Sequence, residues 1–433
     1  HVPMKRHPSS EPPVDPRWLE WLGEGVGELQ IERRRFVDLY LEQRLELRAV
    51  LRGGDPQVEV CRTEGAAARW RSPGRVTLTA RTGLSARSLG EVFDNQISIP
   101  SERPLPVSVM DPPRGWIDWA REVGARLAPA SGVLRYISRR AAVVRPGRWH
   151  LVASPALIRV EREGQHANAL LAVWGHSRLG EWLGELVRPA PDKVWAPEPG
   201  EVLPVVLTDG TAGVLMHELL GHMTESDLVL EGETPLAPMM GATIADSALN
   251  VTDDPTRFDL AGGFDCDDEG VKGTPIHLVR DGRLEHFLCD RAGAAKIGSE
   301  PGRGRRAAWN TPPVVRMSNL VVAPGETAPR ELEASLDRGL VVTRLGGATV
   351  DPVSNRSILR VERGWEIRNG KRRRALRPVE LTGGIMDLLA AIDPVLGNDP
   401  QPDWRLGWCV KGGMSIPTGS EAPTMLINGL EVL

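Results

Sequence analysis

The first third of the chain alternates between apolar and polar residues in the manner of β-strands. Over 37–51 the odd positions are mainly aliphatic, whereas the even positions are mainly Asp, Glu and Arg. A period of two places one face of a strand on a core, so this segment is predicted to be a half-buried strand that ends at the turn residues 53–56. Further strands are predicted at 57–62, 67–71, 76–80, 133–144 and 149–160, the last two flanking a Pro146-Gly147 turn.

Helical periodicity predicts a helix that packs on this sheet. Trp116, Trp119, Val123 and Leu127 recur at intervals of three and four, which places them on one face of an amphipathic helix. Shorter helices are predicted around Trp18 and Trp21 and over 85–93 and 177–187.

The second half of the chain carries short alternating segments separated by tight turns. Asp281-Gly282 and Asn369-Gly370 favour two-residue hairpin loops, so neighbouring segments are expected to pair antiparallel. The proline-rich stretch 188–204 separates the halves. We therefore predict an α+β fold: an N-terminal α/β domain with antiparallel strands over 1–190, and a mainly antiparallel β domain over 200–433. The strands predicted in the second domain are 276–280, 284–289, 314–317, 340–343, 358–362, 365–368 and 425–427.

One predicted helix, within 208–230, carries residues that suit metal chemistry. His217, Glu218 and His222 lie within six residues of one another, and Thr208 or Asp209 is expected to cap the start of the helix. Two histidines can hold a zinc ion, and a glutamate beside the first one can take a proton from water at the metal.

The spacing of the two histidines differs from the common H-E-x-x-H pattern, in which they are four residues apart. Here they are five apart, which puts them about 140° out of line on a regular helix. The helix must therefore be overwound, bulged as in a π-turn, or ending, and Gly221 is expected to ease the distortion. A chance pair of buried histidines is the alternative; the adjacent glutamate and glycine favour a metal site.

Composition narrows the classes of function. The formal net charge is −4, which gives no basis for nucleic-acid binding. No run of 18 apolar residues and no apolar signal segment is present, so we expect a cytoplasmic protein that does not span a membrane. The four cysteines form no C-x-x-C pair, which fits a reducing compartment.

Motifs along 200–433 resemble the TldD/PmbA family of metallopeptidases. The helix is similar to that family's H-E-x-x-x-H helix, and Glu225-Ser226-Asp227 is similar to the acidic segment after it, with serine in place of glycine. Cys409 falls on a G-x-C-G-K segment of the family, with Val410 where glycine is usual. The other matching segments are Val251–Asp254, Asp267–Gly270, Thr274-Pro275, Asp281-Gly282, Gly302–Arg306, Arg316–Asn319, Gly346-Gly347, Val350-Asp351 and Gly397–Asp399.

The resemblance implies a zinc-dependent peptidase in which Cys409 is the third ligand beside His217 and His222, and Glu218 is the catalytic base. It also implies unfolded or leader-type peptides as substrates, including those of ribosomally made peptide natural products. The partner expected from the family is a second copy of this chain, or a related subunit that lacks the zinc motif. The alternatives are zinc-assisted hydrolysis of a non-peptide amide and a non-catalytic scaffold subunit.

Several other residues leave two interpretations open. Glu225 and Asp227 either orient a ligand histidine or end the helix. The basic loop Gly302–Arg306 either binds a carboxylate or is structural. His277 and His286 are expected to be structural, and the basic run 371–374 is expected to be solvated.

Overall fold

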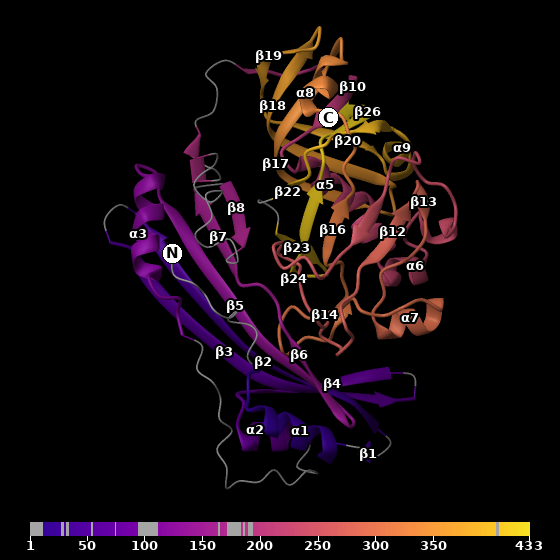
Figure 1. Cartoon of the computed structure of the whole chain (residues 1–433). Helices are drawn as coiled ribbons and strands as arrows, with labels where there is room; N and C mark the ends of the chain where they lie inside the picture. The colour runs from indigo at the N-terminus through magenta and orange to yellow at the C-terminus, as the bar shows by residue number, and fades with distance from the viewer. Residues whose placement is uncertain are drawn as a thin grey trace.

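The computed structural model describes residues 12–433 except for 27–29, 32–33, 53–54, 74, 94–110, 163–164, 171–182, 185–186, 189–193 and 404–406. A long curved sheet forms one side of the molecule, and a β-rich body carrying the C-terminus lies against it (Figure 1). The helix predicted at 177–187 lies largely outside the described residues. No helix in the described part is long and apolar enough to cross a membrane.

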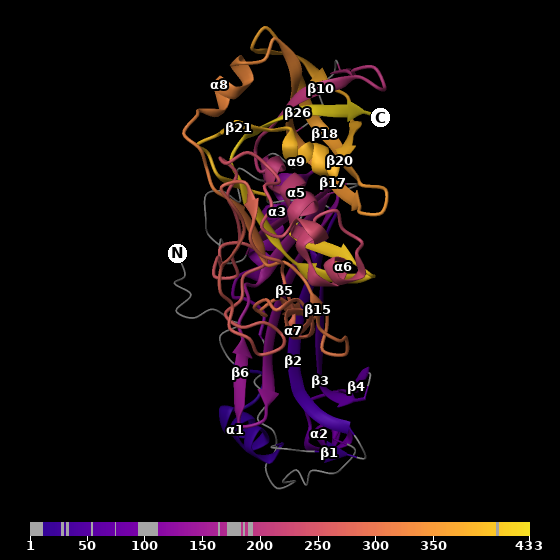
Figure 2. The same cartoon turned by 90° about the vertical axis from the view of Figure 1, so that its right-hand side faces the viewer.

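The long sheet is antiparallel, with the order β4-β3-β2-β5-β7-β8, and β1 and β6 add to β2 and β5. Its central strand β2 pairs along nearly its whole length with β3 and β5, which explains the extended ribbon seen in Figures 1 and 2. The strands are β1 (Gln30–Ile31), β2 (Arg34–Leu51), β3 (Gln57–Ser72), β4 (Arg75–Thr82), β5 (Gly132–Arg145), β6 (Arg148–Val152), β7 (Leu157–Arg162) and β8 (Gln165–Leu170).

Helices cover the apolar face of this sheet at its two ends. α1 (Pro16–Gly25) and α2 (Ala86–Val92) pack with Leu39 and Leu41 of β2, and α3 (Trp116–Leu127) packs with Leu45 and Leu47 further along the strand. The odd positions of β2 therefore face the helices, as the alternation predicts.

The β-rich body contains two larger sheets. The first has the order β17-β10-β26-β20-β18-β19-β9, with β21 on β26, and the second has the order β13-β12-β11-β16-β25-β22. Most pairs are antiparallel, as predicted, while β10–β17, β16–β25 and β9–β19 are parallel. The first sheet comprises β9 (Val194–Trp195), β10 (Val202–Leu207), β17 (Arg338–Asp351), β18 (Arg356–Arg368), β19 (Lys371–Leu376), β20 (Val379–Gly384), β21 (Ile392–Leu396) and β26 (Met425–Val432).

The second sheet comprises β11 (Val251–Asp253), β12 (Ile276–Arg280), β13 (Arg283–Leu284), β16 (Asn319–Val322), β22 (Gln401–Pro402) and β25 (Gly419–Ala422). Two hairpins stand apart from these sheets: β14 (Gly304–Arg305) with β15 (Val314–Val315), and β23 (Trp408–Lys411) with β24 (Met414–Pro417). The helices are α5 (Thr211–Met216), α6 (Ser226–Glu231), α7 (Arg291–Ile297), α8 (Pro329–Ala334) and α9 (Ile385–Ala390). Helix α5 is buried along its whole length between β17 of one sheet and β16 and β25 of the other.

Several predicted strands have different bounds in the structure. The segments 57–62 and 67–71 form one strand, β3, and 358–362 and 365–368 form β18. The predicted strand at 149–160 is split into β6 and β7, which both pair with β5. Of 284–289 only Leu284 belongs to a strand, and of 314–317 only Val314-Val315 does.

Candidate metal centre

The helix that carries His217 and His222 is irregular at the place where the histidine spacing predicts it. Helix α5 passes at His217 into a π-helical turn, His217–Gly221, which is followed by a 3₁₀ turn, His222–Thr224. The backbone N–H of His222 donates to the carbonyl of His217, five residues back. The wider π-turn brings the two rings to the same side of the helix, with their centroids 5.0 Å apart. Of the alternatives left open by the sequence, the structure has the π-turn.

The start of this helix differs from the prediction. Gly210 occupies the N-cap position with a φ of 82°, a left-handed conformation that glycine adopts without steric cost. No side chain caps the helix, so the predicted capping by Thr208 or Asp209 is wrong. The backbone carbonyl of Thr208 instead accepts hydrogen bonds from the backbone N–H and the Oγ1 of Thr211.

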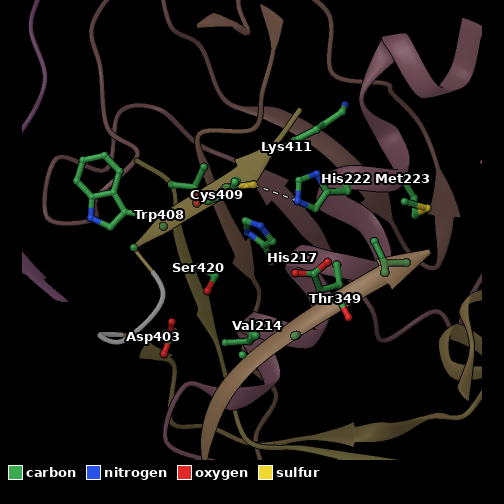
Figure 3. Close-up of a pocket in the computed structure, with 18 of the residues that line it drawn as sticks. Val214, His217, His222, Met223, Thr349, Asp403, Trp408, Cys409, Lys411 and Ser420 are labelled. Atoms are coloured by element: carbon green, nitrogen blue, oxygen red, sulfur yellow. Dashed lines mark hydrogen bonds between the residues drawn. The ribbon is translucent and has the colours of Figure 1, made fainter. Parts of the chain in front are cut away.

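Cys409 lies opposite these histidines although it is 187 residues away from His222 in the chain. The Sγ atom of Cys409 is 3.0 Å from Nε2 of His222 (Figure 3). One donor atom from each of His217, His222 and Cys409 can be chosen so that all three lie within 4.8 Å of one another. Two imidazoles and a thiolate at such distances form a donor set that suits zinc.

These side chains line a cavity of about 420 Å³ that also contains Glu218. Burial raises the pKa of Glu218 above its ordinary value, which moves this carboxyl towards the range of a general base that works near neutral pH. The walls come from the helix, from β17 between Gly347 and Val350, from β23, and from the start of β25 (Figure 3).

The protonation states of the two histidines differ. Burial, and then the nearby His222, lower the pKa of His217 to about 3, so this imidazole is neutral, as a metal ligand must be. Burial also opposes the charged form of His222, but Glu225 and Cys409 outweigh it and raise the pKa of His222 well above its usual value. A metal that binds His222 must therefore displace a proton.

Glu225 orients His222, which resolves one of the open interpretations. Its Oε2 atom lies 3.2 Å from Nδ1 of His222, and its Oε1 accepts from the backbone N–H of Met317 at 3.2 Å. Burial favours the neutral acid, but His222, Lys411 and Arg316 hold the pKa of Glu225 at about 2. A carboxylate bonded to the second nitrogen of a ligand histidine fixes the orientation of its ring.

Asp227 pairs with Lys411 instead of a histidine, because its Oδ1 accepts a hydrogen bond from Nζ of Lys411 at 2.8 Å. Sequence reasoning missed Lys411 and Arg316, which surround Glu225. The resemblance to the family had placed both in matching segments, but no spacing in the sequence links them to Glu225.

The basic loop at 302–306 has its described arginine side chains engaged in contacts within the protein. Arg303, Arg305 and Arg306 are all buried. The guanidinium of Arg303 pairs with Asp253 and with backbone carbonyls, and that of Arg305 donates to the carbonyls of Met317 and Pro417. These contacts join the loop to the rest of the β-rich body, so the structure favours the structural interpretation over a carboxylate site.

The other histidines singled out in the sequence lie outside the cavity lining. Nδ1 of His277 is 3.0 Å from Oγ1 of Thr252, and Nδ1 of His286 is 2.8 Å from the carbonyl of His277. In the basic run, Arg372 pairs with Glu333 and Arg374 with Glu366, so these side chains are exposed but ion-paired.

Comparison with known proteins agrees with this geometry. Residues 199–433 match the family model described as the PmbA/TldA metallopeptidase C-terminal domain. The chain belongs to the PmbA/TldD metallopeptidase family. The match covers α5, the π-turn and Cys409, so the family domain contains all three candidate ligands.

Curated relatives of this family are about 30% identical to the chain. A metalloprotease TldD homologue of Buchnera aphidicola is 30% identical over 261 residues, which are 60% of this chain and 54% of that protein. A metalloprotease of Methanothermobacter thermautotrophicus is 33% identical over 239 residues, 55% of this chain and 51% of the relative. A zinc metalloprotease TldD homologue of Saccharolobus solfataricus is 28% identical over 240 residues, 54% and 52% of the two chains. The chain thus spans about half the length of the curated relatives it matches.

Two solved structures share the fold over nearly the whole chain. A protein of Thermotoga maritima superposes with a TM-score of 0.70 at 18% identity and covers 92% of this chain and 96% of its own. TldE of Thermococcus kodakarensis superposes with a TM-score of 0.66 at 15% identity, and the match covers 96% of this chain and 99% of TldE. At these identities the similarity shows the fold alone.

Proposed function

We propose that this chain is a zinc-dependent peptidase that hydrolyses peptide bonds of unfolded or leader-type peptides. One observation carries the proposal: His217, His222 and Cys409 converge, with donor atoms within 4.8 Å, on a cavity whose lining includes Glu218. A structural zinc site does not need a carboxylate able to transfer protons, so the presence of Glu218 supports catalysis.

The residues present fit a catalytic zinc ion. His217 is neutral, His222 has its second nitrogen bonded to Glu225, and Cys409 faces His222. Three protein donors leave a fourth position open, as catalytic zinc sites do. When bound, zinc supplies a Lewis acid that lowers the pKa of water and polarises a carbonyl group.

Glu218 is the candidate for moving protons. It follows His217 directly in the π-turn, so the two side chains leave the helix in different directions, and both line the cavity. In its ionised form it accepts a proton from the attacking water. In its protonated form it returns the proton to the leaving amine nitrogen, which cannot depart as an anion.

The geometry of β17 supports extended peptides as the substrate class. Among the described residues, β17 pairs with β10 only at Leu340–Val342, whereas its pairing with β18 continues to Asp351. On the side away from β18, residues 347–351 of β17 pair with no other strand in the described part of the chain, and Gly347, Thr349 and Val350 of this edge line the cavity. We propose that a peptide backbone adds to this edge. Main-chain hydrogen bonds are common to all extended peptides, which favours broad sequence tolerance and excludes folded proteins.

The assembly and the pathway are part of the same proposal. We propose that the chain acts as a dimer, with itself or with a related subunit that lacks the zinc motif, in the maturation of a ribosomally made peptide. A small closed pocket would have favoured a non-peptide amide, whereas the edge of β17 at residues 347–351, in the same cavity as Glu218, favours a peptide. A scaffold subunit would not need the proton-transfer group.

Hydrolysis of one substrate in two states tests the proposal. The purified chain is incubated with a small domain in its folded form and with the same domain unfolded by reduction and alkylation, before and after zinc is removed with a chelator. We expect cleavage of the unfolded form only, loss of cleavage with the chelator, and recovery when about one zinc per chain is restored. Equal rates on the two forms, or full activity without metal, would contradict the proposal. Light scattering alongside reports the assembly, and an inactive monomer would point to a missing partner subunit.

A further inference from the structure

The hairpin that carries Cys409 is not part of a larger sheet. In the described part of the chain, β23 and β24 pair with each other and with no other strand. The side chain of Val410, between Cys409 and Lys411, is exposed at 67%. Apart from its direct connection to β25, the hairpin is therefore held by contacts of its residues with the rest of the β-rich body, and these contacts help to set the position of Cys409 relative to His222.

Two cations provide such contacts, and both reach Glu225. Nζ of Lys411, on the hairpin, donates to Oε2 of Glu225 at 2.6 Å and to Oδ1 of Asp227 at 2.8 Å. Arg316, which lies just before β16, donates from Nη2 to the backbone carbonyl of Lys411 at 3.1 Å, and its Nη1 lies 3.5 Å from Oε2 of Glu225. The side chains of Glu225 and Arg316 are fully buried, and that of Lys411 is 25% exposed.

These contacts connect His222, Cys409, Lys411 and Glu225 in a closed ring. Glu225 bonds to Nδ1 of His222, and Nε2 of the same ring faces Sγ of Cys409. Lys411 lies two residues after Cys409 on the same strand (Figure 3), and its ammonium donates back to Glu225. A single carboxylate thus touches the ring of one ligand and holds the hairpin that carries another.

We propose that Lys411 is a positioning residue: by binding Glu225 it places the thiol of Cys409 opposite His222 and so completes the metal site. The inference rests on the proposed function, because it takes His222 and Cys409 to be ligands of one ion. Lys411 is not one of the three candidate ligands, and in this proposal it acts through Glu225.

Removing the charge of Lys411 separates this role from a general structural one. Glu225 keeps Arg316, His222 and the backbone N–H of Met317 as partners, so its charge remains compensated. The hairpin, in contrast, loses the ion pairs to Glu225 and Asp227 and keeps, at this end, the hydrogen bond from Arg316 to the carbonyl of Lys411. The thiol of Cys409 is then held less firmly, which weakens zinc binding. Loss of a group that orients a ligand costs about 10–100-fold in metal affinity.

The test compares Lys411→Met with Lys411→Arg, which restores a cation, and with Lys371→Met as a matched control. Lys371 is an exposed lysine at the start of β19, outside the cavity lining. Zinc affinity is measured by competition with a chromophoric chelator, and cobalt-loaded protein is examined for the thiolate-to-cobalt charge-transfer band. The thermal unfolding of the metal-free proteins is recorded in parallel.

We expect Lys411→Met to bind zinc about 10–100-fold more weakly than Lys371→Met and to show a weakened thiolate band. Metal-free unfolding should be the same for both, and Lys411→Arg should recover most of the affinity. Asp227→Asn, which removes only the second acceptor of Lys411, should show a smaller loss in the same direction and serves if Lys411→Met does not fold.

The inference would be overturned if Lys411→Met had wild-type zinc affinity and an unchanged cobalt spectrum. If Lys411→Met does not fold, the same result in Asp227→Asn would overturn it. This result would leave the proposed function intact. A wild-type protein whose cobalt spectrum lacks any thiolate band is a different failure, because it would remove Cys409 from the metal site and the proposed function with it.

Discussion

Gly221 shows how a single residue shapes the candidate metal site. The sequence suggests that this glycine is needed for an unusual backbone conformation before His222. Its φ of −53° and ψ of −60° are ordinary helical values, so that explanation is wrong. The requirement is for space instead: a Cβ atom at this position would lie 2.5 Å from Sδ of Met317 and 2.7 Å from its Cε. Glycine lets Met317 pack directly against the π-turn.

Gly221→Ala is therefore expected to destabilise the protein by about 1–3 kcal/mol, the typical cost of overpacking a core. Gly124→Ala is the matched control, because Gly124 lies inside α3 and a Cβ there would make ordinary contacts at 3.6 Å with Leu51. The control should be stabilised by up to about 1 kcal/mol, since alanine is the better helix former. Chemical denaturation of both variants checks the prediction, and a Gly221→Ala protein as stable as wild type would refute it.

At the scale of the elements, periodicity predicts most strands but not where they join. Gly65 interrupts the pattern between 57–62 and 67–71, yet β3 runs through it. The glycine is there because the ring of Trp309 packs on it, within 2.3 Å of where a Cβ would stand. The segment 284–289 alternates but is not a strand beyond Leu284, since Leu288 exchanges backbone hydrogen bonds with Thr224 and Ser226 beside the metal helix. Tertiary contacts of this kind leave no local signal.

The candidate site, like the strands, was predictable from the sequence only in part. The five-residue spacing of His217 and His222 indicates both a metal and a distorted helix, because the two rings cannot otherwise meet. Cys409 came only from the family resemblance. Lys411 could not be placed, because it meets Glu225 across 186 residues and a lysine at that separation has no characteristic spacing.

At the scale of the whole molecule, the polar face of β2 is where the long sheet packs on the β-rich body. Asp38 and Glu42 alternate with the apolar residues of this strand, yet both are buried, and Asp38 lies 3.7 Å from Nη2 of Arg306 in the β-rich body. Across this junction Tyr40 donates to Asp268 at 3.0 Å, and Arg69 pairs with Glu269 at 2.7 Å. Alternation cannot distinguish a polar face that meets water from one that meets a charged partner surface. The ionic junction holds the long sheet against the β-rich body.

Asp268→Asn tests how much this junction contributes to the stability of the fold. Asp268 is 2% exposed and pairs with Arg139 at 3.2 Å, so its loss leaves a buried guanidinium with less compensation and should cost about 3–5 kcal/mol. Glu59→Gln removes the partner of Arg48 in an exposed pair on the long sheet and should cost at most about 1 kcal/mol. Calorimetric unfolding compares the two, and equal shifts would show that the junction contributes no more than a surface pair.

The central claim is that Glu218 transfers protons, whereas the three candidate ligands hold the metal. Glu218→Gln keeps the size and polarity of the side chain but removes the base, so zinc should stay bound at about one ion per chain. Peptide hydrolysis should fall by about 10²–10⁴-fold, the usual contribution of general acid–base catalysis. Cys409→Ser is the control, because exchanging a thiolate for a poor ligand should lower zinc content and activity together.

Zinc content measured beside the peptidase rate of Glu218→Gln is the most direct test. The predicted result is wild-type zinc with turnover reduced by at least about 10²-fold. A Glu218→Gln protein that loses its zinc, or one that keeps normal turnover, would contradict the account.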